Sequence, residues 1–221
     1  MKAVPILAAS ALVSLVACQQ TPILERNPGA ERASYSEWTC DGEKVLAQFY
    51  GARVVISDSR SSRWLDRGTQ VGKVFRAENA EFRFRGDSAT WTRGDQTSDC
   101  EVRPLPEEWQ EAKADMRGPL RFMARGEQPQ WLLKITDKDV FFEVPQEEQY
   151  RRLPASEPDY YLDMWTYDIQ TREDRMRVQI TDGLCRDPRT SEPYPSTVRA
   201  TWNDQVFRGC GRWLAKGDYR P

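Results

Sequence analysis

The chain has 221 residues, of which 32 are basic and 34 are acidic, and it contains no histidine. Because the charges nearly balance, no global positive field draws the chain onto nucleic acid, and no nucleic-acid partner is expected. The lack of histidine excludes Ser/His and Cys/His nucleophile pairs and every His-ligated zinc site. We expect neither a metal ion nor a cofactor. Eight residues each of Trp, Tyr and Phe favour a folded chain with small cores, although the mean hydropathy is only -0.74.

Residues 1–17 have the pattern of a bacterial lipoprotein signal peptide. Lys2 precedes an apolar stretch that is too short to span a bilayer comfortably. This stretch ends in Leu15-Val16-Ala17-Cys18, which resembles a lipobox, and the following Gln19 resembles the pattern for delivery to the outer membrane. We expect a palmitate-type lipid anchor on Cys18, with the protein held on the outer membrane, facing the periplasm, through this anchor only. The rival is an ordinary signal peptide that happens to contain a cysteine.

The cysteine count supports the lipid anchor. Five cysteines, an odd number for an exported chain, leave four for disulfide bonds once Cys18 is lipidated. Three connectivities are then open, and nearest-neighbour pairing keeps each bridge inside one compositional block. This pairing predicts disulfides between Cys40 and Cys100 and between Cys185 and Cys210. A zinc site built from the same four thiolates is the rival, but the sequence has no C-x2-C spacing.

The chain then divides into a tether and two β-rich blocks. Residues 18–34 are polar with scattered proline and glycine, which indicates a flexible tether. Residues 35–103 are short β-type runs separated by Asp-Gly and Gly-Asp turns, the pattern of a small antiparallel β-barrel. Residues 104–118 carry apolar residues at helical spacing and predict a connecting helix. Residues 119–221 return to β-type runs, so we predict an all-β protein with a second, mainly β domain.

The first block resembles the membrane-bound inhibitors of C-type lysozyme. The resemblance covers roughly residues 35–102 and depends on Thr39-Cys40-Asp41-Gly42, Val45 to Tyr50, Arg85-Gly86-Asp87 and the closing Cys100. It implies a small antiparallel barrel stapled by a disulfide, in an envelope protein whose partner is a C-type lysozyme. The activity it implies is inhibition by inserting two loops into the enzyme's carboxylate-lined cleft.

Those two loops correspond to two short segments here. The family's Ser-Gly-x-x-Tyr motif aligns with Val71-Gly72-Lys73-Val74-Phe75, and its Thr-Lys-Gly motif aligns with Phe84-Arg85-Gly86. Both glycines are retained, whereas Val, Phe and Arg replace the motif Ser, Tyr and Lys. A basic loop suits a cleft that holds two carboxylates. The rival interpretation is a solvated, arginine-rich strand face. By resemblance, the residues expected to bind lysozyme are Val71, Gly72, Lys73, Phe75, Arg85 and Gly86.

The second block resembles an uncharacterised domain of bacterial envelope lipoproteins over roughly residues 120–214. This resemblance implies no function. We expect Trp131 to pack near the second disulfide, and a ligand groove beside them stays open as an alternative. The resemblance depends on Arg125-Gly126-Glu127-x-Pro129-x-Trp131, Cys185-Arg186-Asp187, Ser191-Glu192-Pro193-Tyr194-Pro195 and Gly209-Cys210-Gly211.

Two further segments have alternative interpretations. Residues 157–168 combine acids with aromatic rings, as in a sugar platform or a calcium loop, but also as in a strand with rings on its core face. Asp182 and Asp187 suit either a carboxylate pair for glycoside hydrolysis or two turn acids near a disulfide. The sequence favours a non-enzymatic lipoprotein that inhibits C-type lysozyme. The alternative is a non-inhibitory structural or ligand-binding envelope protein with peptidoglycan or another glycan as partner.

Overall fold

The computed structural model is almost entirely β-structure, which confirms the predicted fold class. The only helical segment that it describes is the single 3-10 turn η1, Pro145–Glu147. None of the helical structure in the described ranges is long and apolar enough to cross a membrane. The predicted connecting helix over 104–118 lies outside these ranges, as do Cys18, Val71 and Gly72. The structure describes residues 34–68, 73–103 and 120–214.

The first eight strands form a closed antiparallel barrel in which each strand pairs with the next and β8 pairs back to β1. The side chains of β6 point alternately into and out of the barrel: Phe82 and Phe84 are buried, whereas Arg83 and Arg85 are exposed. The strands are β1 Ser34–Cys40, β2 Glu43–Tyr50, β3 Arg53–Ser57, β4 Ser62–Arg67, β5 Lys73–Ala77, β6 Ala80–Arg85, β7 Ser88–Arg93 and β8 Gln96–Val102.

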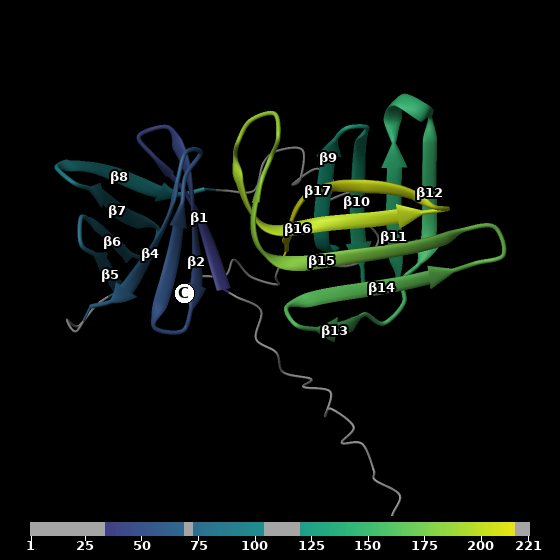
Figure 1. Ribbon diagram of the computed structural model, residues 1–221, viewed down its shortest axis with the longest axis horizontal. Helices are drawn as coiled ribbons and strands as arrows, with labels where there is room; N and C mark the ends of the chain where they lie inside the picture. Colours follow the sequence, from purple (N-terminus) through teal and green to yellow (C-terminus); the bar gives the residue numbers. More distant parts are fainter. Residues whose placement is uncertain (1–33, 69–72, 104–119, 215–221) are drawn as a thin grey trace, which may run out of the picture. The chain divides into compact units, whose positions relative to one another are not determined.

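The remaining nine strands form one antiparallel sheet in the order β12-β11-β10-β9-β17-β16-β15-β14-β13. In Figure 1, β14–β17 run across β9–β12, so the two halves of this sheet face one another. The strands are β9 Leu120–Glu127, β10 Gln130–Thr136, β11 Asp139–Val144, β12 Gln149–Pro154, β13 Asp159–Tyr161, β14 Met164–Gln170, β15 Arg175–Arg186, β16 Pro193–Trp202 and β17 Gln205–Trp213.

Each of the two sheets encloses a core and contains one disulfide. Trp38, Phe82 and Trp91 fill the barrel, and Trp131, Phe142 and Phe207 belong to the core between the two halves of the nine-stranded sheet. The disulfides join Cys40 to Cys100 and Cys185 to Cys210, which is the pairing predicted from the sequence. Cys40 and Cys100 are direct register partners on β1 and β8, so the first disulfide closes the barrel.

Glycines allow β9 and β17 to approach closely where the nine-stranded sheet curls. A Cβ atom on Gly209 would lie 2.0 Å from the carbonyl oxygen of Arg125, and one on Gly126 would lie 2.1 Å from Nε1 of Trp131. The Trp131 indole donates a hydrogen bond to the carbonyl oxygen of Arg208 at 3.2 Å. Gly126, Gly209 and Trp131 of the second-block motifs therefore meet at this seam in a packing role. Trp131 belongs to the main core and Cys210 to a separate cluster, so the expected packing of Trp131 against the second disulfide is not seen.

The barrel packs against the nine-stranded sheet, and all described residues fall within one compact unit. Glu37, Leu46 and Gln48 alternate with core residues and point out of the barrel, yet all three are buried. Gln48 donates a hydrogen bond to the carbonyl oxygen of Pro195 at 3.3 Å. The outer face of β1 and β2 is thus covered by the sheet rather than by water.

Candidate functional site

Lys73 and Arg85, one from each segment aligned with the inhibitor loops, lie at the same end of the barrel. β5 and β6 pair in antiparallel orientation, so the start of β5 and the end of β6 lie next to each other. Lys73 is the first residue of β5 and pairs in register with Phe84, the neighbour of Arg85 on β6. The structure therefore brings Lys73, Arg85 and Gly86 together. We refer to these three residues as the basic end of the barrel.

Local geometry exposes the charges of the basic end. Arg85 points outward next to the β6–β7 turn, where Gly86 adopts a φ of 61° that favours glycine. The Lys73 ammonium lies 5.0 Å from the centroid of the Phe84 ring, a cation–π distance. Within the described ranges, neither Lys73 nor Arg85 forms an ion pair. Both charges are therefore available to an acidic partner.

Three other basic residues of the barrel, Arg76, Arg83 and Arg93, are neutralised by acidic neighbours. Glu81 accepts hydrogen bonds from Arg76 at 2.6 Å and from Arg83 at 2.9 Å, and these guanidinium groups lower the pKa of Glu81 despite some desolvation. Arg93 donates to the buried carboxylate of Asp58 at 2.8 Å. The charges of these three arginines are therefore offset within the barrel, unlike those of Lys73 and Arg85.

Phe75 has a different environment from the other aligned residues. Its ring is buried in the barrel core, stacked on Phe84 with centroids 6.3 Å apart, and 5.7 Å from the Phe49 ring. A phenylalanine suits this position because a buried hydroxyl would need a hydrogen-bonding partner. Phe75 thus supports the strand that carries Lys73 and has no surface to offer a partner.

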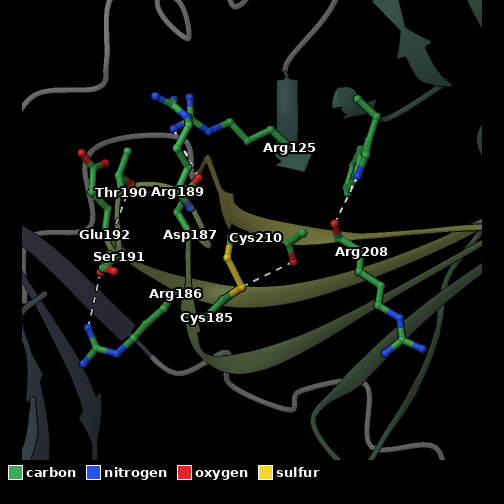
Figure 2. The surroundings of a disulfide bond; sticks show 12 residues. Arg125, Cys185, Arg186, Asp187, Arg189, Thr190, Ser191, Glu192, Arg208 and Cys210 are labelled. Carbon is green, nitrogen blue, oxygen red and sulfur yellow. Dashed lines mark hydrogen bonds and ion pairs between the residues drawn. A yellow bond between two sulfur atoms is a disulfide. The ribbon is translucent and has the colours of Figure 1, made fainter. Parts of the chain in front are cut away.

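The second disulfide attaches the end of the β15–β16 hairpin to β17. We call this hairpin end, residues 183–195, the arm. The register between β15 and β16 shifts between Asp182 and Cys185. The hairpin beyond this point lies against the outer face of β17 and β9. There Tyr194 packs with Met123 and Cys210 in a small second core. Figure 2 shows the disulfide from Cys185 to Cys210 at the base of the arm. The disulfide is therefore part of a second layer of packing.

Asp187 organises the tip of the arm. Its carboxylate accepts backbone hydrogen bonds from Arg189 at 3.0 Å and Thr190 at 2.9 Å and lies 3.5 Å from the Arg125 guanidinium, as Figure 2 shows. Burial raises the pKa of Asp187, but the two N–H groups and Arg125 outweigh burial and hold this pKa below its usual value. A carboxyl group that stays ionised in this way is suited to holding a loop.

Asp182 also serves the packing of the sheet. Its Oδ1 accepts hydrogen bonds from the Trp213 indole at 3.1 Å and from Ser196 Oγ at 3.3 Å. Asp182 and Asp187 therefore lie on opposite sides of the register shift, each engaged by its own set of donors. These contacts match the interpretation of the two acids as structural groups beside a disulfide.

The aromatic residues of 157–168 divide between core and surface. Tyr167 is buried in the main core, and Trp165 packs against it while also contacting Tyr160, with centroids 4.4 Å apart. Tyr160 donates a hydrogen bond to Asp163 at 2.9 Å, and Tyr161 is exposed. Nowhere in the described ranges do three or more potential metal-ligating side chains form a group, so the calcium-loop interpretation gains no support.

Sequence reasoning missed the contacts between the arm and the barrel. Arg186 donates hydrogen bonds to the carbonyl oxygens of Asp58 and Ser61, the latter at 2.9 Å. Lys44 of β2 forms an ion pair with Glu192 of the arm. The position of Arg186 next to Cys185 was a weak sign of a structural role. Nothing in the sequence indicated that its partners lie more than 120 positions away.

Comparison with known proteins does not place the chain in a family. No protein-family model matches it, and no curated protein matches it. The candidate site therefore depends on the geometry of the barrel and on the resemblance of its motifs.

Proposed function

We propose that the protein is a non-enzymatic envelope lipoprotein that inhibits C-type lysozyme by placing the basic end of its barrel in the enzyme's cleft. One observation carries this proposal: Lys73 and Arg85, from two separate motifs, lie at the adjoining ends of the paired strands β5 and β6, without ion-pair partners among the described residues. A lysozyme cleft offers two carboxylates, one of them ionised at neutral pH. Arg85 can bind such a carboxylate with two parallel hydrogen bonds.

The packing of the nine-stranded sheet supports this orientation. Hydrogen bonds and ion pairs to the sheet come from β1, from β2 and from residues 58–62. In the closed order of eight strands, β1 and β2 lie across the barrel from β5 and β6, whose adjoining ends carry Lys73 and Arg85. The sheet therefore holds the barrel while leaving the basic end available to a partner.

Calorimetric titration of the detergent-solubilised protein into a C-type lysozyme tests the proposal. We expect binding that weakens with salt and that Arg85→Ala reduces by about tenfold or more, because a charge-assisted hydrogen bond is lost. Arg83→Ala is the matched control: this residue is exposed on the same strand, but it is paired with Glu81. Equal loss in both variants, or no binding by the parent protein, would reject the basic end as the binding surface.

The lipid anchor is a separate part of the proposal. Cys18 in Leu15-Val16-Ala17-Cys18 is the cysteine left over after the two disulfides are made. We expect Cys18→Ser to move the protein from the membrane fraction to the soluble periplasmic fraction. A Cys18→Ser protein that still sediments with the outer membrane would show that the anchor is elsewhere.

A second candidate function is glycan binding by a non-inhibitory envelope protein. An exposed aromatic pair favours it: the Tyr50 and Trp64 rings are 5.4 Å apart, and the Arg53 guanidinium lies 4.3 Å from the Trp64 ring centroid. Aromatic faces stack on the apolar faces of sugar rings. Co-sedimentation with purified peptidoglycan that Trp64→Ala abolishes, together with no lysozyme inhibition, would favour this candidate.

A further inference from the structure

The outer face of the nine-stranded sheet carries a group of arginines beside the arm. Arg177 of β15, Arg199 of β16 and Arg208 of β17 alternate with core residues and are all exposed. They come from three adjacent strands, so they share one surface. We call these three residues the arginine face.

Two of these arginines are direct cross-strand neighbours. Arg199 and Arg208 are register partners in the β16–β17 pair. Side chains opposite one another in an antiparallel pair have Cβ atoms about 5 Å apart, and like charges at that separation destabilise the pair. Within the described ranges, neither guanidinium forms an ion pair. The sheet thus maintains two adjacent positive charges that its own side chains do not offset.

The surroundings explain why the charge stays unbalanced. The nearest side chains are neutral: Gln179 of β15 is the register partner of Arg199, and Thr201 lies two residues along β16. Asp168 is paired with Arg177 at 2.6 Å, and Glu127 is paired with Arg189 of the arm at 3.5 Å. The carboxylates of Asp168 and Glu127 are therefore already engaged.

The side chain of Arg208 is directed away from the tip of the arm. In Figure 2, its guanidinium extends away from the group formed by Asp187, Arg189 and Arg125. Val206, its neighbour on the same face of β17, is also exposed. The arginine face thus exposes the guanidinium groups of Arg199 and Arg208, with the apolar side chain of Val206 beside them.

We propose that the arginine face binds the phosphate groups of anionic phospholipids at a membrane surface. Guanidinium groups bind phosphate oxygens with two parallel hydrogen bonds, and they are weakly hydrated for a cation. Basic side chains near an anionic membrane each strengthen binding by about 1 kcal/mol, so the Arg199 and Arg208 pair accounts for roughly a 30-fold increase in affinity. This interaction is separate from the proposed lysozyme binding, which uses the barrel and not the nine-stranded sheet.

Vesicle co-sedimentation tests the proposal with the full chain carrying Cys18→Ser, so that no acyl chain contributes. We expect binding to vesicles of phosphatidylcholine with phosphatidylglycerol, little binding to phosphatidylcholine alone, and loss at high salt. Arg199→Gln with Arg208→Gln should weaken binding by about 30-fold. Arg60→Gln with Arg63→Gln, two exposed barrel arginines, is the control for net charge. Arg199→Lys with Arg208→Lys keeps the charge and should retain part of the binding.

Three results would overturn the proposal. Equal weakening by the control pair would reduce the effect to net charge. Equal binding to both kinds of vesicle would exclude recognition of anionic headgroups. Arginine-dependent binding of inorganic phosphate without vesicle binding would identify a soluble phosphate compound as the ligand. Because all four substituted side chains are exposed, the thermal unfolding midpoint of each variant should match that of the parent and confirm folding.

Discussion

Arg212 and Glu37 form a buried ion pair in which Nη1 lies 2.6 Å from Oε2, joining β17 of the sheet to β1 of the barrel. The Tyr35 hydroxyl donates a hydrogen bond to the carbonyl oxygen of Trp213 beside this pair. Burial, partly opposed by Arg212, raises the pKa of Tyr35 to about 12, so its hydroxyl remains a donor at physiological pH. The barrel is therefore joined to the sheet by charges withdrawn from water.

This relationship predicts an asymmetry between single and double variants. Arg212→Met should lower the free energy of unfolding by about 3 to 5 kcal/mol, because it leaves the Glu37 carboxylate buried without its cation. Adding Glu37→Leu should recover much of that loss, since a buried pair of apolar residues avoids the desolvation cost. Urea unfolding measures both. A double variant no more stable than Arg212→Met would contradict the conclusion that Glu37 and Arg212 form a buried ion pair.

The seam between β9 and β17 predicts intolerance to a single methyl group. Gly209→Ala would place a Cβ 2.0 Å from a backbone oxygen that cannot move without disrupting the strand pair. We expect a loss of about 3 kcal/mol or more in the free energy of unfolding, the upper range for overpacking. Gly68→Ala serves as the comparison, because its nearest neighbour would be 3.5 Å away and its φ is not in the left-handed region. Similar unfolding midpoints for the two variants would contradict the close approach.

The second disulfide should determine the order of the arm. Replacing Cys185 and Cys210 together by serine opens a loop with a sequence separation of 25 and should cost about 3.5 kcal/mol. Hydrogen exchange should rise first in residues 186–195, since they depend on the disulfide for their position. Trypsin cleavage after Arg186 or Arg189 provides a second readout. Unchanged protection of these residues would show that Asp187 and Arg125 hold the arm without the disulfide.

Asp187 predicts a pH dependence of stability. Its pKa in the folded protein lies below the usual value, so its contribution is complete above the unfolded-state pKa of about 3.9 and is lost as the pH falls through the folded-state pKa. Asp187→Asn keeps the oxygen that accepts the two backbone hydrogen bonds but removes the charge opposite Arg125. The difference in stability between parent and variant should be constant from pH 5 to 7 and shrink below pH 4. A stability difference that grows on acidification would show that the pKa of Asp187 is raised, not lowered, in the folded protein.

Sequence patterns predicted the local features of this fold well. The alternation of Phe82 and Phe84 with arginines identified the inside of the barrel, and the cysteine spacing predicted both disulfides. The pattern failed where burial depends on the other sheet. Glu37 and Gln48 lie on the outward face of their strands, where polar residues normally face water, and nothing nearby in the sequence indicates Arg212 or Pro195 as partners. Long-range contacts of this kind emerge only from the assembled fold.

The most direct test of the central claim is an inhibition titration against a C-type lysozyme acting on bacterial cell walls. In the proposed alignment with the lysozyme inhibitors, Val71 replaces a serine, and leaving a lysozyme carboxylate against an apolar side chain costs about 1 to 3 kcal/mol. We therefore predict weak, salt-sensitive inhibition that Arg85→Ala largely removes and that Val71→Ser strengthens by about tenfold or more. An inhibition constant unchanged by both substitutions, or no inhibition at millimolar protein, would contradict the account.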